Sequence, residues 1–151
     1  MADLDRRGFL TMAAGFCAAC ALGDTLLAAA DNAKPMEVGS LDDFKKTTVI
    51  DKYAKTPDGF FLVNEDGKLV AISSRCTHKG FTVTANKDGT FTCPKHHSEF
   101  SSHGTVTKGQ AKSTLPRYAI TVNGGKVVVD TTKSFTEKQF DSKDASVEIP
   151  K

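Results

Sequence analysis

Short apolar runs separated by turn-forming residues recur through the middle of the chain. Three pairs of such runs are joined by turns rich in Asn and Gly: 60–63 with 69–72, 82–84 with 90–92, and 119–122 with 127–129. Asn, Asp and Gly between two apolar runs are typical of a tight turn that joins antiparallel strands. The pattern therefore predicts three β-hairpins and an all-β fold.

Weaker signals extend this pattern to both sides. Strands are expected near 36–38 and 48–50, with a short helical turn at 41–44 begun by Ser40. The polar stretch 133–151 lacks the rhythm of strand and turn, so we expect a loosely packed C-terminal arm. The predicted organisation is a leader at 1–30, one folded domain at 31–132 and the arm at 133–151.

The first 30 residues differ in composition from the rest. Arg6-Arg7 precedes an apolar, alanine-rich run that ends in the small residues 28–30, which is typical of an export signal with a cleavage position. The paired arginines resemble a twin-arginine signal, a route that exports folded proteins, although Asp5 stands where Ser or Thr is usual. A retained membrane anchor remains the alternative, because 8–30 is long enough to cross a bilayer.

Composition narrows the possible partners. The chain has 151 residues, 25% of them charged, and a formal net charge of +2. This suits one globular domain, and no basic stripe of the kind that binds nucleic acid is present. Cys17 and Cys20 lie within the leader and are interpreted as part of it, so an exported domain would contain two cysteines, Cys76 and Cys93.

Histidines and cysteines gather in two adjacent loops. Cys76 and His78 follow one predicted strand, and Cys93 and His96 follow another. A disulfide between the two cysteines would leave the histidines unexplained. Because the hairpin between the loops brings them to the same end of a sheet, the four side chains can converge, which predicts a metal site.

Two metal centres suit this ligand set. Tetrahedral zinc accepts two thiolates and two imidazoles, but structural zinc sites usually pair Cys with Cys and His with His. Here each loop offers one of each, as C-x-H and C-x-x-H, which favours a [2Fe-2S] centre with both cysteines on one iron and both histidines on the other. The zinc-binding structural module is kept as the alternative.

The motifs 76–80 (CTHKG) and 93–98 (CPKHHS) resemble the two cluster-binding boxes of the Rieske family. The resemblance implies a fold of three antiparallel β-sheets with the cluster-binding loops at one end, and one [2Fe-2S] cluster. It implies Cys76, His78, Cys93 and His96 as ligands, and Ser98 as a hydrogen-bond donor to a cluster sulfur.

Four positions depart from the family pattern. Phe81 and Lys95 stand where Rieske proteins of cytochrome bc complexes have a disulfide, and Phe100 stands where those proteins have a tyrosine donor. Losing one donor is expected to lower the reduction potential within the range of about −150 to +300 mV. His97 replaces a usual glycine, so it is strained if its φ is positive, and it is the one competitor of His96 as a ligand.

The expected activity is one-electron transfer rather than catalysis by this chain alone. We expect an exported, extracytoplasmic carrier, or the small Rieske subunit of an oxidoreductase such as a bc-type complex or arsenite oxidase. Membrane contact is expected only through a retained leader or a partner complex. Arg75, Lys79 and Lys95 beside the ligands suggest an acidic redox protein or larger catalytic subunit as partner. His103 is expected to be a surface residue.

Overall fold

The structure, a computed structural model, describes residues 35–46 and 48–151. The predicted leader at 1–30 and its two cysteines lie outside these residues. None of the helices in the described part of the chain has the length and hydrophobicity of a membrane-spanning segment.

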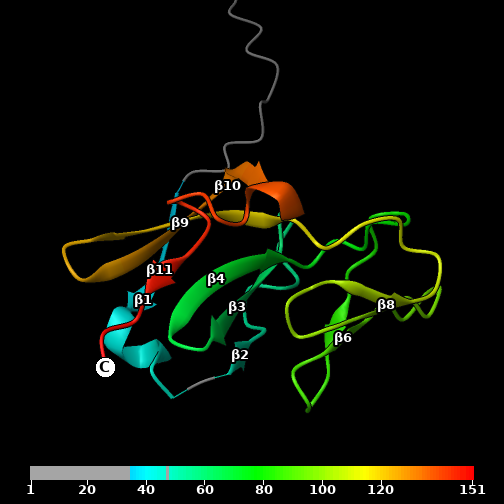
Figure 1. The fold of residues 1–151 in the computed structure, drawn as a ribbon, viewed down its shortest axis with the longest axis horizontal. Coiled ribbons are helices and arrows are strands. Elements are labelled where there is room, and N and C mark those ends of the chain that lie inside the picture. Colours follow the sequence, from blue (N-terminus) through cyan, green and yellow to red (C-terminus); the bar gives the residue numbers. More distant parts are fainter. Residues whose placement is uncertain (1–34, 47) are drawn as a thin grey trace, which may run out of the picture. The chain divides into compact units, whose positions relative to one another are not determined.

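The larger of two antiparallel sheets has seven strands (Figure 1). In order across it lie β1 (Met36–Ser40), β10 (Lys126–Phe135), β9 (Arg117–Asn123), β4 (Lys68–Ser73), β3 (Phe60–Glu65) and β2 (Val49–Ile50), while β11 (Val147–Glu148) pairs with β4. A 3-10 turn, η1 (Leu41–Phe44), follows β1, and the Ser40 N–H donates to the Asp43 carboxylate over 3.0 Å. The strands and the helical turn predicted between residues 36 and 50 are thus confirmed.

The smaller sheet has four short strands. These are β5 (Thr84–Ala85), β6 (Phe91–Thr92), β7 (Glu99–Phe100) and β8 (Val106–Lys108), which pair in chain order. All three predicted hairpins are present, as β3–β4, β5–β6 and β9–β10. Their turns include glycines with positive φ, among them Gly67 at +91° and Gly125 at +80°, which explains why the turn residues were such a reliable signal.

Two hydrophobic cores lie on opposite faces of β3 and β4. Phe61 and Val63 pack with Phe91 and Phe100 of the small sheet, whereas the alternate residues of β3 pack with side chains of β9 and β10. The strands therefore form three layers, as the Rieske resemblance implied. Pairing of β4 with β9 joins two of these layers into the continuous seven-stranded sheet.

The C-terminal residues are not the loosely packed arm that their polarity suggested. β10 runs on to Phe135, a second 3-10 turn, η2 (Glu137–Gln139), follows, and β11 completes the chain's pairing with β4. Ala145 is fully buried and Ile149 is 8% exposed within the second core. Residues 133–151 are therefore part of the folded domain. A few apolar side chains hold them there, and these give only a weak signal in a mostly polar sequence.

Replacing Ile149 with alanine tests this packing. We expect Ile149→Ala to lower the free energy of unfolding by about 2 kcal/mol, because a buried isoleucine loses its contacts and leaves a cavity. Glu148→Ala, at the exposed neighbouring position, should change it by less than about 0.5 kcal/mol. Chemical denaturation followed by circular dichroism measures both, and equal effects of the two substitutions would contradict the assignment.

Candidate metal centre

The first ligand loop, residues 75–82, leaves the end of β4 and is closed by a bridge between Arg75 and Thr82. Within it the Cys76 N–H donates to the Phe81 carbonyl and the Gly80 N–H donates to the Cys76 carbonyl, each over 2.8 Å. Gly80 has a φ of +72°. The loop is thus folded back on Cys76.

The second ligand loop, residues 93–98, joins β6 to β7 and repeats this geometry. The Cys93 N–H donates to the Ser98 carbonyl over 2.8 Å, and the His97 N–H donates to the Cys93 carbonyl over 2.9 Å. His97 therefore occupies the place that Gly80 has in the first loop, and its φ is +53°. His97 thus has the positive φ at which a residue other than glycine is strained, because its Cβ crowds its own backbone.

The two loops bring His78 and His96 together. Their ring centroids lie 4.6 Å apart with the rings nearly perpendicular. The Nδ1 atom of each ring is buried and has no hydrogen-bond partner. A buried polar atom without a partner is costly, and coordination of a metal would remove that cost. His97, by contrast, is exposed.

Cys76 and Cys93 of the same two loops are buried free thiols, 2% and 0% exposed. Burial raises the pKa of the Cys76 thiol, and the neighbouring Cys93 adds to the effect, so a metal cation is what would stabilise the thiolate here. Desolvation, and then His96, lowers the pKa of His78 and favours the neutral imidazole that binds metals. Two soft donors beside two imidazoles fit the mixed set of a Rieske cluster.

A third loop, residues 109–116, packs against both ligand loops. The buried Ser98 Oγ accepts hydrogen bonds from the backbone N–H groups of Gln110 and Ala111, each over 3.1 Å. A Cβ atom at Gly109 would lie 2.6 Å from the Ser98 Cα, so this approach requires glycine. The Thr77 hydroxyl donates to the Ser113 carbonyl over 2.7 Å. The third loop thus fixes the second and first loops relative to each other.

The basic side chains near the site differ in whether they are bound within the protein or exposed to solvent. The Arg75 guanidinium turns inward and donates to the carbonyls of Thr56 and Pro57 and to the Thr82 hydroxyl. It is therefore a structural clamp at the base of the first loop rather than the free docking cation that the sequence suggested. Lys79 and Lys95 are exposed, and Lys112 of the third loop is exposed as well.

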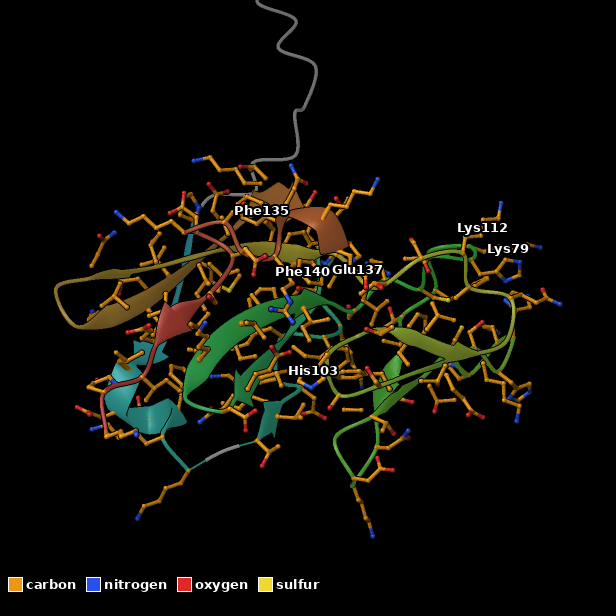
Figure 2. The ribbon with its side chains drawn as sticks, viewed as in Figure 1. Lys79, His103, Lys112, Phe135, Glu137 and Phe140 are labelled. Carbon is orange, nitrogen blue, oxygen red and sulfur yellow. The ribbon has the colours of Figure 1, made fainter. Side chains whose placement is uncertain are left out.

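His103 lies away from the ligand loops, as expected of a surface residue. Its Nδ1 is 2.9 Å from Oε1 of Glu65, the carboxylate that also binds Arg117 at 2.8 Å. The Arg117 guanidinium stacks over the Phe140 ring at 4.2 Å. These contacts join His103, from the loop after β7, and Phe140, from the C-terminal residues, to the large sheet. Figure 2 labels both His103 and Phe140.

Sequence reasoning missed two side chains that lie near the histidines, Lys112 of the third loop and Phe81 of the first loop. Lys112 lies 16 residues beyond His96, and nothing in the local pattern indicated that it would lie near His78. The exposure of Phe81 beside the His96 ring was also not predicted.

Comparison with known proteins agrees with this geometry. The sequence model of the Rieske [2Fe-2S] domain matches residues 34–119, more than half of the chain. The cytochrome b6-f complex iron-sulfur subunit of Chlorobaculum thiosulfatiphilum is 26% identical over 141 residues, which cover 84% of this chain and 76% of that protein. Its counterpart from Chlorobaculum tepidum is 28% identical over 138 residues, with the same coverage.

A solved structure is also similar. The plasma membrane Rieske protein PetC3 from Synechocystis PCC 6803 matches with a TM-score of 0.50 and 36% sequence identity. The match covers 62% of this chain and 97% of that one.

Substitution of His97 tests the geometry of the second loop. We expect His97→Gly to raise the free energy of unfolding by about 0.5–1 kcal/mol, because glycine adopts a positive φ without a steric penalty. His97→Ala keeps the penalty and should give no such gain. Thermal unfolding of the three proteins distinguishes them, and equal stabilities of the glycine and alanine variants would show that the loop carries no strain at this position.

Proposed function

Because this chain belongs to the Rieske [2Fe-2S] family, whose members bind one [2Fe-2S] cluster, we propose that it is a one-electron carrier whose cluster is held by the two ligand loops. The observation that carries the proposal is the pairing of the buried, unpartnered Nδ1 atoms of His78 and His96 with two buried free thiols. When bound, the cluster supplies a reversible one-electron couple.

The proposed ligands are Cys76 and Cys93 to one iron, and His78 and His96 through Nδ1 to the other. His96 is preferred to His97 because its ring packs against His78, whereas His97 is exposed and occupies the turn position. Each loop then contributes one ligand to each iron. This arrangement makes the relative position of the two loops decisive for binding.

Ser98 and Phe100 set the polarity next to the ligands. The Ser98 oxygen accepts two backbone N–H groups, so its own hydroxyl proton is left to donate; we propose a cluster sulfur as the acceptor. Phe100 is buried in the first core and carries no hydroxyl. With one donor instead of two, the negative reduced state is less stabilised, and the expected potential is lower than in a relative with both donors.

The arrangement of the donors also supports the cluster over mononuclear zinc. The two thiols, Cys76 and Cys93, are neighbours, and the two imidazoles, His78 and His96, are neighbours. Two metal atoms, each bound by one pair, suit this arrangement better than one tetrahedral ion.

Metal analysis of ligand variants tests the assignment. Purified wild-type protein should contain two irons and two acid-labile sulfides per chain, in line with one [2Fe-2S] cluster, and essentially no zinc. Cys93→Ser and His96→Ala should lose both iron and sulfide, whereas His97→Ala should keep them, since its side chain lies outside the proposed ligand set. A colourless protein with one zinc, or loss of iron in His97→Ala but not in His96→Ala, would refute the assignment.

We also propose that the protein acts outside the cytoplasmic membrane after export in the folded state. Iron-sulfur clusters are assembled inside the cell, so a route that carries folded proteins suits a protein with this cofactor, and Arg6-Arg7 resembles the signal for that route. A soluble carrier or the small subunit of another oxidoreductase is favoured over a standard quinol-oxidising subunit, because Phe81 and Lys95 stand in the disulfide positions and Phe100 replaces the tyrosine. Its proposed partner is a redox protein or a larger catalytic subunit.

Replacing both leader arginines tests the export route. We expect Arg6→Lys with Arg7→Lys to leave the cluster-loaded protein inside the cell, because a twin-arginine route requires the arginine pair. Asp5→Ser, which moves the motif towards the usual one, should preserve export. Fractionation of cells with detection of bound iron measures this, and unchanged export of the double variant would exclude the twin-arginine route.

A further inference from the structure

Charge is distributed unevenly around the predicted ligands. The three loops at 75–82, 93–98 and 109–116 contain four Lys or Arg residues and no Asp or Glu, while the whole chain has 20 basic and 18 acidic residues. The Arg75 side chain is bound inward. Three lysines, Lys79, Lys95 and Lys112, are left on the surface, one from each loop.

These three lysines, here called the lysine ring, are free to meet a partner. All three are exposed, and none forms an ion pair with any residue that the structure describes. Lys79 directly follows His78 in the first loop, and Figure 2 shows Lys79 and Lys112 near each other at the same end of the small sheet. Their positive charges therefore act at the place where the two histidines lie.

An apolar side chain lies beside the lysine ring. Phe81 is 40% exposed, the highest fraction among the large hydrophobic side chains of the described residues. Its ring centroid is 5.6 Å from that of His96, and the Lys95 Nζ lies 5.9 Å from the Phe81 ring centroid. An exposed aromatic ring rimmed by charge is the usual composition of a protein docking surface, with an apolar anchor and a polar rim.

We propose that Lys79, Lys95, Lys112 and Phe81 form the docking surface for a redox protein whose own electron-transfer face has an apolar centre rimmed by carboxylates. This inference rests on the proposed function and names the chemistry of the partner. Carboxylates opposite the lysine ring steer the encounter and set its orientation, while the Phe81 ring packs against the apolar centre and brings the partner to His96. One electron then passes from this protein to the partner, or in the reverse direction.

Two forms of cytochrome c with opposite surface charge test whether the docking surface prefers a partner with carboxylates. Native cytochrome c presents lysines around its haem edge, and succinylated cytochrome c presents carboxylates in their place. The measured quantity is the ratio of the rates at which the reduced, cluster-loaded protein reduces the succinylated and the native ferric haem, each taking one electron. Because both rates are measured on the same protein, a change in its reduction potential largely cancels in the ratio.

We expect the wild-type ratio to exceed about ten at low salt. It should approach one as the ionic strength rises from about 0.01 M to about 1 M, over which the Debye length falls from about 30 Å to about 3 Å. The triple variant Lys79→Glu/Lys95→Glu/Lys112→Glu should reverse the preference. The matched control Lys55→Glu/Lys68→Glu/Lys143→Glu makes the same change in net charge at exposed lysines elsewhere and should retain most of the wild-type ratio.

Phe81→Ser tests the apolar anchor separately. It should lower the rate with succinylated cytochrome c about tenfold or more, since an exposed aromatic anchor commonly contributes about 1.4 kcal/mol or more to an encounter, and leave its salt dependence in place. The rate with hexacyanoferrate(III), a small anion that needs no apolar contact, should stay the same. Equal losses with both oxidants would show that Phe81 affects the metal centre instead of docking.

The outcomes separate this inference from the proposed function. If the purified protein contains no iron and no sulfide, the metal analysis refutes the proposed function before any rate is measured. A loaded protein whose ratio is near one, or whose control variant changes as much as the lysine-ring variant, keeps the proposed function and overturns the docking surface. Sedimentation with phosphatidylglycerol vesicles that depends on the lysine ring, together with a ratio near one, would assign these residues to a lipid surface and overturn the redox-protein partner.

Discussion

The backbone closure of the two ligand loops is the constraint on which the site depends. In each loop the cysteine N–H donates to a carbonyl five residues on, and the cysteine carbonyl accepts from the residue four positions on. Each cysteine is thus held from both sides at the end of a strand. Because the two adjacent loops share this pattern, they bring two thiols and two imidazoles to the same end of the fold. The third loop fixes the distance between the two loops through its hydrogen bonds with Ser98 and Thr77.

The site is also continuous with the core. Cys76 and Cys93 belong to the same buried cluster as Phe61, Phe91 and Leu115. Because β3 and β4 are buried on both faces, the strand that leads into the first loop has little freedom to shift. A metal centre built on such elements is rigid, and metal binding contributes directly to the stability of the surrounding fold. Rigid positioning is what a carrier needs, since electron transfer works best with little rearrangement at the metal.

Much of the fold follows from local pattern, because a hairpin depends on residues that are near in sequence. The turn residues alone predict the three hairpins and the Leu41–Phe44 turn, and the spacing of the two motifs is enough to nominate Cys76 and His96 as ligands. The C-terminal packing was not predictable in this way, because Ala145 and Ile149 are single apolar residues in a polar stretch. The inward turn of Arg75 depends on carbonyls 18 and 19 residues away, which no local pattern reveals.

Low-temperature electron paramagnetic resonance of the dithionite-reduced protein would show whether two histidines bind one iron of a [2Fe-2S] cluster. A reduced [2Fe-2S] centre with two histidine ligands on one iron should give a rhombic signal whose average g value lies below that of an all-cysteine cluster. We expect this signal at one spin per chain. A silent spectrum from protein that has kept its metal, or a signal typical of four cysteine ligands, would contradict the assignment of His78 and His96.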